Sequence, residues 1–138
     1  MKLVLDASVA LHWVLNEPQS PQALHLRDEF RKQLHEFIAP DTFVVEVSHS
    51  LTRAERQKIL LPGDSAILLQ EIMTTAPLLE SYLPLIPRAL EISSNMRIGV
   101  YDCLYVALAE QEHCDLVTSE VKLIKNLPGF PIRNLATI

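Results

Sequence analysis

Long apolar runs are absent from this chain. After Met1 and Lys2 only three apolar residues precede Asp6, which is too short for the apolar core of a secretory signal peptide. No run elsewhere approaches the roughly 20 residues that a membrane-spanning helix needs. We therefore expect a cytoplasmic protein with no membrane segment.

Cysteine is almost as scarce. The chain has two, Cys103 and Cys114, and their spacing is not that of a zinc site. Each falls within or beside an apolar helical pattern, where a thiol behaves as a small hydrophobe. We predict that both are buried, reduced thiols.

Several sequence motifs of catalysis and nucleotide binding are also missing. There is no G-x-S-x-G nucleophile elbow, no P-loop and no G-x-G-x-x-G turn. An excess of positive charge is missing too, because 12 basic residues face 17 acidic ones and the net charge is −5. A protein that binds nucleic acid by broad phosphate neutralisation normally carries a basic face, so any RNA contact must be local.

The composition itself is that of a folded chain. Of the 138 residues, 49% are hydrophobic and 21% are charged, unlike the polar and highly charged composition of disordered chains. This length suits one well-formed core and is too short for two. We predict one domain spanning residues 1–138.

Short apolar segments alternate with helical patterns along the chain. Strands are predicted at residues 2–5, 37–39, 78–82, 115–118 and 132–135. Helices are predicted between them, including residues 21–35, 85–96 and 121–127, with Ser8, Asp41 and Asp64 as N-terminal caps. This alternation predicts an α/β fold, a three-layer α/β/α sandwich with a mostly parallel central sheet.

Acidic residues follow two of the predicted strands. Asp6 ends the first strand and Glu120 follows the fourth, so both emerge at the same sheet edge if these strands are parallel neighbours. Asp102, in the first turn of a helix, belongs to that edge too. Gathered carboxylates repel one another unless protons or hard cations compensate, and Mg²⁺ and Mn²⁺ prefer such oxygen ligands. A divalent-metal site of this kind can hydrolyse phosphodiesters without a nucleophilic side chain.

Four segments, in order, carry a family resemblance. They are Val-Leu-Asp-Ala-Ser-Val at residues 4–9, Pro40-Asp41 before the helix with Glu46, Tyr-Asp-Cys-Leu-Tyr-Val-Ala-Leu-Ala at 101–109, and Leu-Val-Thr-Ser-Glu at 116–120. Together they resemble the motifs of PIN-domain nucleases, especially the VapC toxins of toxin–antitoxin pairs. The resemblance implies a PIN-like fold, Mg²⁺- or Mn²⁺-dependent cleavage of RNA, homodimers, and inhibition by a cognate antitoxin protein.

The resemblance also implies a set of site residues. Asp6, Glu46 and Asp102 match the acidic positions of the family directly. Glu120 is a departure, because the family more often has Asp in its Thr-x-Asp motif, and the longer side chain shifts or weakens a second metal. We predict that these four acids are catalytic and bind the metal.

Hydroxyl side chains accompany the acids. Ser8 and Thr118 match positions where a hydroxyl commonly supports the acidic cluster. We predict supporting roles for both, outside the metal's direct ligands.

Each acid also has a structural alternative. Asp6 can be a turn residue, Asp102 can complement the helix dipole, and Glu120 can cap the last short helix. Glu46 can be a solvated charge that pairs with Ser50 or Arg53 on its own helix.

Other residues of interest receive structural interpretations. We interpret His49 as a structural histidine and Trp13 as a packing residue, although Trp13 can offer a base a stacking face. Tyr101 and Tyr105 fall too close to an apolar helical stripe to be platforms for nucleotides.

Two other functions fit the pattern less well. A receiver-like signalling domain also binds Mg²⁺ in an acidic crevice, but it needs an acid pair on an early strand, and the first strand here provides only one acid. A PIN-like protein-interaction module, with a metal site weakened by Glu120, is the other alternative.

Overall fold

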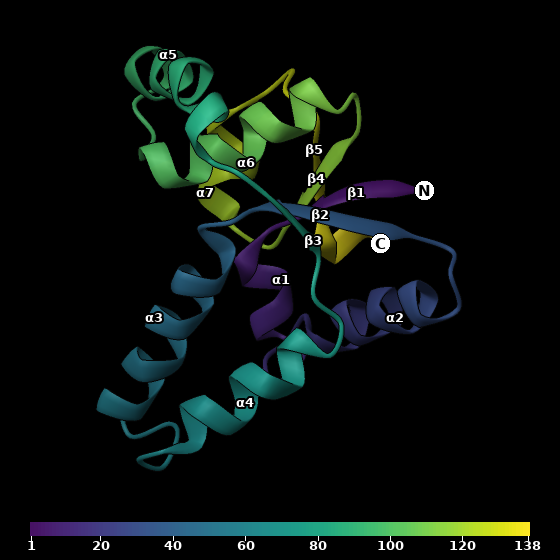
Figure 1. Ribbon diagram of the computed structural model, residues 1–138, viewed down its shortest axis with the longest axis vertical. Coiled ribbons are helices and arrows are strands. Elements are labelled where there is room, and N and C mark those ends of the chain that lie inside the picture. Colours follow the sequence, from purple (N-terminus) through teal and green to yellow (C-terminus); the bar gives the residue numbers. More distant parts are fainter.

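A five-stranded, entirely parallel sheet forms the centre of the molecule in the computed structural model, which describes all 138 residues. Its strands are β1 (Lys2–Leu5), β2 (Glu36–Pro40), β3 (Leu78–Glu80), β4 (Asp115–Thr118) and β5 (Ile132–Asn134). Their order across the sheet is β3-β2-β1-β4-β5 (Figure 1). All five strands predicted from the sequence are confirmed, with small differences at their ends.

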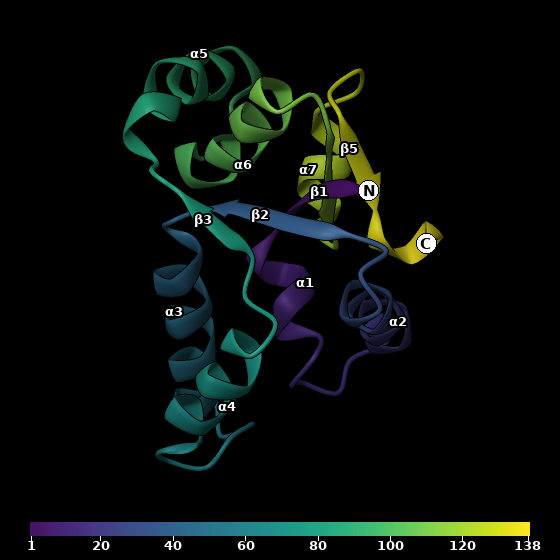
Figure 2. The same cartoon turned by 45° about the vertical axis from the view of Figure 1, so that its right-hand side comes forward.

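Helices cover both faces of this sheet. They are α1 (Ala7–Leu11), α2 (Ser20–Arg31), α3 (Phe43–Arg56), α4 (Asp64–Met73), α5 (Ile86–Met96), α6 (Val100–Gln111) and α7 (Val121–Asn126), with 3₁₀ turns η1 (Leu83–Leu85) and η2 (Leu135–Thr137). Figure 2 shows α5 and α6 on one side and α1, α2 and α3 on the other. The predicted α/β/α sandwich is confirmed.

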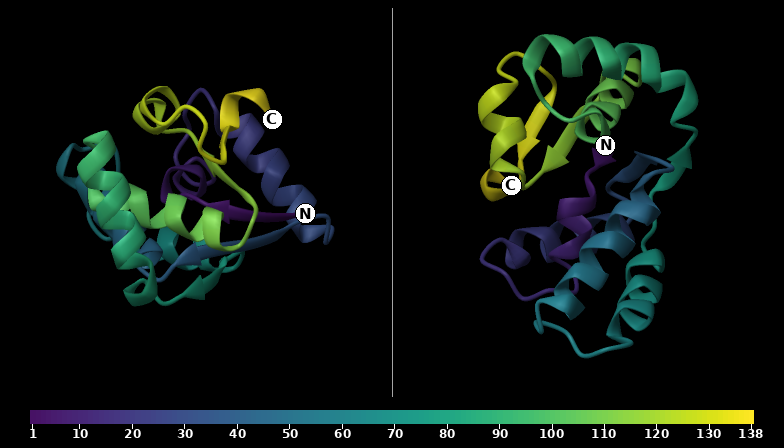
Figure 3. Two further views of the ribbon diagram at one scale, coloured as in Figure 1. Left: turned by 90° about the horizontal axis from the view of Figure 1, so that it is seen from above. Right: turned by 90° about the vertical axis from the view of Figure 1, so that its left-hand side faces the viewer.

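The helices α3 and α4 form an antiparallel pair that extends away from the sheet (Figure 3). α3 begins directly beyond the carboxyl end of β2, so its first turn lies at the sheet edge while its remaining turns lie outside the central layers. Side chains in this first turn therefore face the region where the parallel strands end.

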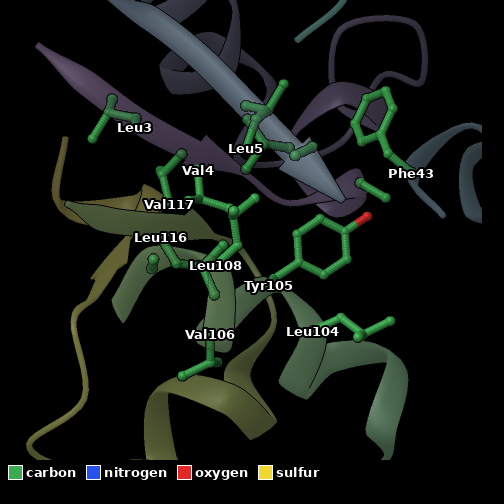
Figure 4. Packing of buried hydrophobic residues seen from close by; sticks show 14 of the residues in the cluster. Leu3, Val4, Leu5, Phe43, Leu104, Tyr105, Val106, Leu108, Leu116 and Val117 are labelled. Atoms are coloured by element: carbon green, nitrogen blue, oxygen red, sulfur yellow. The ribbon is translucent and has the colours of Figure 1, made fainter. Parts of the chain in front are cut away.

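The core lies where β1 and β4 contact α6. Val4, Leu5, Leu116 and Val117 are completely buried, as expected for parallel strands that are covered on both faces. The middle of α6 is buried on all sides as well, since its residues 103–109 are all buried. Figure 4 shows these side chains packed together.

Strand register brings distant segments of the chain to one edge. Leu5 of β1 pairs with Val117 of β4, and the Asp6 N–H donates to the Val117 carbonyl at 3.2 Å. β2 and β3 lie on one side of β1, and β4 and β5 lie on the other. The sheet order therefore reverses at β1, and ligands of open α/β sheets bind outside the carboxyl ends of strands at such a switch point.

The predicted helix caps are wrong. Asp6, not Ser8, occupies the N-cap position of α1, and Thr42, not Asp41, occupies that of α3. Asp41 instead accepts a hydrogen bond from the Tyr82 N–H at 3.1 Å, which ties the start of α3 to the end of β3. A tertiary partner thus competes successfully with local capping.

Two further helix boundaries differ from the predictions. α2 ends at Arg31 rather than at residue 35, because Gln33 adopts a left-handed backbone with φ of 64°. Asp64 is the first residue of α4, after Gly63 with φ of 92°, and accepts from the Leu61 N–H at 3.0 Å.

The structure also bears on the cysteines and on the lack of a membrane segment. Both cysteines are free thiols, with Cys103 buried and Cys114 only partly so, so the predicted burial is confirmed for Cys103 and holds only in part for Cys114. None of the helices has the length and apolar character required to cross a membrane.

Candidate active site

The four acids predicted from the sequence line a single cavity of about 530 Å³. Asp6 follows β1, Glu120 follows β4, and Glu46 and Asp102 lie in the first turns of α3 and α6. The cavity is completed by Ala7, Ser8, Leu11, Val45, His49, Ser50 and Tyr101. The fold therefore brings together residues that lie as far apart in the chain as positions 6 and 120.

Asp6 is the most deeply buried of these acids, with 3% of its surface exposed. Its Oδ2 accepts hydrogen bonds from Ser8 Oγ at 2.6 Å and from Thr118 Oγ1 at 2.7 Å. The same two hydroxyls accept from the backbone of the turn after β4, Ser8 from the Ser119 N–H at 3.2 Å and Thr118 from the Glu120 N–H at 3.0 Å. The two hydroxyls thus fix Asp6 and the turn that carries Glu120 relative to each other.

Burial also changes the acidity of Asp6. Loss of solvation raises the pKa of its carboxyl, the hydrogen bonds from Ser8 and Thr118 oppose this, and the charge of Glu120 raises the pKa further. The ionised form of Asp6 is therefore costly in the protein alone, and a nearby cation would stabilise it.

Glu46 has two oxygens in different surroundings. Its Oε2 accepts a hydrogen bond from the Tyr105 hydroxyl at 3.0 Å, whereas its Oε1 is buried and has no hydrogen-bond partner. Burial raises the pKa of Glu46 to about 7, with the Tyr105 hydrogen bond opposing the shift and the charges of Asp6 and Asp102 adding to it.

The structural alternative for Glu46 is therefore wrong. Its carboxylate makes no hydrogen bond or ion pair with Ser50 or Arg53; it accepts from Tyr105, on another helix, and the nearby Thr42 hydroxyl also lowers its pKa. An unpartnered, buried carboxylate oxygen is uncommon in folded proteins and calls for an explanation such as an ion or a water.

Asp102 is half-buried at the start of α6. Burial and, to a smaller extent, the charge of Asp6 raise its pKa to about 6, while Lys122 of α7 acts in the opposite direction. Its place in the first turn of α6 also lets its negative charge complement the helix dipole. This structural role and a role in the cavity are compatible.

Glu120 differs from the other three acids because it is exposed to solvent. It occupies the N-cap position of α7, but its side chain accepts no capping hydrogen bond. The capping alternative is therefore wrong, and the carboxylate remains free at the wall of the cavity.

Comparison with known proteins identifies the fold family. The family model described as PIN domain matches residues 3–126. The chain belongs to the PIN-domain family. Its strand order of 3-2-1-4-5 also differs from the 2-1-3-4-5 order of receiver-type folds, so the receiver-like alternative is wrong.

Several relatives of this PIN domain carry ribonuclease names. Ribonuclease VapC3 of Pyrobaculum aerophilum is 29% identical, over 94% of this chain and 98% of that protein. Ribonuclease VapC9 of Mycobacterium tuberculosis is 32% identical, over 88% of this chain and 87% of that protein.

Solved structures share the fold at lower sequence identity. The crystal structure of PAE2754 from Pyrobaculum aerophilum superposes with a TM-score of 0.72 at 17% identity, covering 99% of this chain and 94% of the other. VapBC2 from Rickettsia felis, solved bound to a DNA fragment from its promoter, gives 0.69 at 15% identity, covering 97% and 98%.

The donor set of this PIN domain fits a hard divalent cation. All four acidic residues at the cavity supply carboxylate oxygens, and one of these oxygens, Glu46 Oε1, is buried without a partner. In this conformation no three acidic, histidine or cysteine side chains are close enough to hold one ion by themselves. Mg²⁺ commonly keeps several waters and takes only one or two carboxylates directly, so the arrangement fits an ion that is partly hydrated.

One residue of this site was not predicted from the sequence. Tyr105 was expected only to pack, yet its hydroxyl contacts Glu46. The available signal was its position three residues after Asp102, which places both on one side of α6, together with the need of a buried phenol for a partner.

Two further residues at the cavity were given structural interpretations. Tyr101 is 62% exposed and lines the cavity, so its assignment to an apolar stripe is wrong. His49 is exposed and also lines the cavity. Trp13, by contrast, is buried and donates its indole N–H to the Ala23 carbonyl at 3.0 Å, which confirms the packing interpretation.

Proposed function

We propose that this PIN domain is a divalent-metal-dependent endoribonuclease and the toxin of a VapBC-type toxin–antitoxin pair. The observation that carries the proposal is the convergence of Asp6, Glu46, Asp102 and Glu120 on one cavity at the switch point of the sheet. Relatives that match most of the chain and are named ribonucleases support it.

The side chains at the cavity favour attack by water over attack by a protein nucleophile. The hydroxyls of Ser8 and Thr118 both donate to Asp6. Neither is paired with a histidine that would activate it. This arrangement favours hydrolysis of a phosphodiester by water.

Each acid has a distinct task in this mechanism. Asp6 and Asp102 would hold the principal Mg²⁺ or Mn²⁺ ion, with Glu46 placing the ion or a water and Glu120 assisting a second ion. When bound, such an ion acidifies water and stabilises the negative charge that develops on the phosphate. Because Ser8 and Thr118 occupy Asp6 Oδ2, its other oxygen, Oδ1, remains the one for a ligand.

Glu46 is suited to proton transfer. Its Oε1 lacks a partner, and in the protein without metal burial raises the pKa of the carboxyl to about 7; a general base works best when its pKa lies near the working pH. Oε1 can therefore accept a proton from water in the cavity while Oε2 remains bonded to Tyr105.

The rim of the cavity suits single-stranded RNA. Val45 and Tyr101 directly precede Glu46 and Asp102, line the cavity, and are 71% and 62% exposed. Proteins recognise unpaired RNA bases by stacking them on exposed aromatic side chains. A phosphate beside the four acids would then have its neighbouring base stacked on Tyr101. Such a local contact needs no broad basic face, which agrees with the net charge of −5.

Cleavage assays with the purified protein test the proposal. We expect Mg²⁺ or Mn²⁺ to be required for cleavage of single-stranded RNA, and Asp6→Asn to abolish cleavage while the unfolding midpoint shows that the variant remains folded. Cleavage that survives chelation of divalent ions, or that persists in folded Asp6→Asn, would contradict the proposal.

The proposed partners can be tested separately. The toxin assignment implies a cognate antitoxin, and VapBC assemblies are among the proteins that share this fold. We expect the product of a small neighbouring reading frame, with a DNA-binding amino-terminal half, to co-purify with the chain and inhibit cleavage. We also expect a homodimer, which light scattering at several protein concentrations measures.

Two observations favour a second candidate function, a PIN-like protein-interaction module. Glu120 is exposed, and no three side chains are placed to hold an ion in this conformation. Titration with Mn²⁺ separates the two functions, since a ligand that binds the folded state raises the unfolding temperature. An unchanged unfolding temperature at millimolar Mn²⁺ would favour the interaction module.

A further inference from the structure

A hydrogen bond between α6 and α3 links two parts of the cavity wall. The Tyr105 hydroxyl donates to Glu46 Oε2 at 3.0 Å, across 59 positions of sequence. Tyr105 is fully buried, and Figure 4 shows its ring among apolar side chains that include Leu5 and Phe43, with the hydroxyl pointing away from α6. Burial and the neighbouring carboxylates raise the pKa of the phenol, so it remains a neutral donor.

The contact makes the two oxygens of Glu46 different, although the residue as a whole lines the cavity. Oε2 is bonded to Tyr105, and Oε1 is buried without a partner. Asp6 shows the same division, since Ser8 and Thr118 both donate to its Oδ2. In both acids, hydroxyl donors hold one oxygen and make no hydrogen bond to the other.

α6 contributes to the cavity twice through this arrangement. Asp102 lies in its first turn and Tyr105 follows three residues later, a spacing that places both on the same side of the helix. Asp102 lines the cavity itself, whereas Tyr105 reaches it through Glu46. A single buried helix therefore carries Asp102 itself and holds Glu46 through the hydrogen bond from Tyr105.

We infer that Tyr105 is a positioning residue whose hydroxyl holds Glu46 in the conformation that presents Oε1 to a bound cation or its water. A glutamate has several rotatable bonds, and restricting them in advance lowers the entropy lost when the ligand binds. The inference rests on the proposed function. Removal of such an outer hydrogen bond typically lowers metal affinity or activity by about 10- to 100-fold.

Tyr105→Phe tests the inference because it keeps the buried ring and removes only the hydroxyl. We expect the Mn²⁺ concentration at half of the thermal shift to rise by about 10- to 100-fold, and kcat to fall more than KM changes. Tyr82→Phe is the matched control, because Tyr82 is exposed and its hydroxyl has no hydrogen-bond partner; we expect wild-type values for it.

A double-variant comparison shows whether Tyr105 acts through Glu46. In a Glu46→Ala background, Tyr105→Phe should cause no further loss of Mn²⁺ affinity. Wild-type Mn²⁺ affinity in the single Tyr105→Phe variant, or an undiminished loss in the Glu46→Ala background, would overturn the inference.

A crystal structure of the wild-type protein with Mn²⁺ provides a test that depends on no variant. Retention of the contact from Tyr105 to Oε2, with Oε1 directed to the ion or to its water, is the expected result, and a Glu46 turned away from the ion would overturn the inference. A wild-type protein that binds Mn²⁺ but leaves RNA intact would refute the proposed ribonuclease alone, because the Mn²⁺ titration still decides the role of Tyr105.

Discussion

Glu46→Gln should stabilise the metal-free protein at pH 8 and weaken its response to metal. Glutamine keeps the size of the side chain and an oxygen that accepts from Tyr105, but it cannot carry the charge. Burial and the charges of Asp6 and Asp102 disfavour that charge in the folded state. The substitution therefore separates the cost of the carboxylate from the packing of its side chain.

The magnitude follows from the pKa of Glu46, which is raised from 4.5 to about 7. At about 1.4 kcal/mol per pKa unit, this difference corresponds to about 3 kcal/mol. Part of the side chain is accessible to solvent, which screens the charge, so about 1–2 kcal/mol is the expected effect. For a chain of this size, that is a rise of about 3–8 °C in the unfolding midpoint.

The direction with pH follows from proton linkage. Between pH 4.5 and about 7 the folded state keeps the Glu46 proton that the unfolded state releases, so this group lowers stability progressively as the pH rises through that window. The advantage of the glutamine variant should therefore be absent below pH 4.5 and complete above about pH 7.

Thermal unfolding with and without Mn²⁺ at pH 8 provides the assay. Without metal the variant should unfold at the higher temperature. Millimolar Mn²⁺ should stabilise the wild type more than the variant. The stabilisation of the wild type should be about 2.7 kcal/mol when the Mn²⁺ concentration is 100-fold above its dissociation constant. Glu55→Gln on the same helix is the control, because its carboxylate accepts from the Ser65 N–H and its pKa is lowered; this control should not be stabilised. A metal-free Glu46→Gln less stable than wild type at pH 8 would refute the reasoning.

Three further predictions concern other parts of the cavity. Thr118→Val removes one of the two hydroxyls on Asp6 Oδ2 and should lower Mn²⁺ affinity by about 10- to 100-fold, measured by calorimetry. Glu120→Gln should lower cleavage less than Asp6→Asn does, because Glu120 is exposed whereas Asp6 is buried among its partners; a comparison of kcat values checks this. Tyr101→Ala should raise KM for single-stranded RNA by about 10-fold, the value of one stacked base, while Tyr101→Phe keeps the wild-type KM.

The strands and three of the acids were predictable because local sequence determines them. Buried parallel strands are continuous apolar runs, and residues 2–5 and 115–118 match the observed β1 and β4. An acid that directly follows such a strand must lie at its carboxyl edge, and this placed Asp6 and Glu120. Asp102 followed from the break in the helical pattern before α6.

The role of Glu46 could not be predicted from local sequence patterns. Its helical spacing with Ser50 and Arg53 is the same as that of a solvated charge, and only the family resemblance selected it. The partner that distinguishes it, Tyr105, lies 59 positions away. No local pattern contains that contact.

The two tyrosines of α6 illustrate the same limit. They are four residues apart, a spacing that predicts similar environments, yet Tyr101 is 62% exposed and Tyr105 is inaccessible. Tyr101 lies in the first turn, where the helix reaches the rim of the cavity, whereas Tyr105 lies one turn further into the core. The difference in their exposure depends on where α6 begins relative to the edge of the sheet. The spacing of apolar residues in the sequence does not give that position.

The arrangement of hydroxyls explains how this scaffold keeps costly carboxylates in place. Burial raises the pKa of Asp6, Glu46 and Asp102, so in the protein without metal the ionised form of each carboxyl costs free energy and lowers stability as the pH rises. Hydroxyl donors on one oxygen of Asp6 and of Glu46 partly offset that cost, and they do so from elements that the apolar core already fixes. Substitutions of these hydroxyls should therefore alter metal affinity more than folding, whereas substitutions of the acids should alter both, in opposite directions.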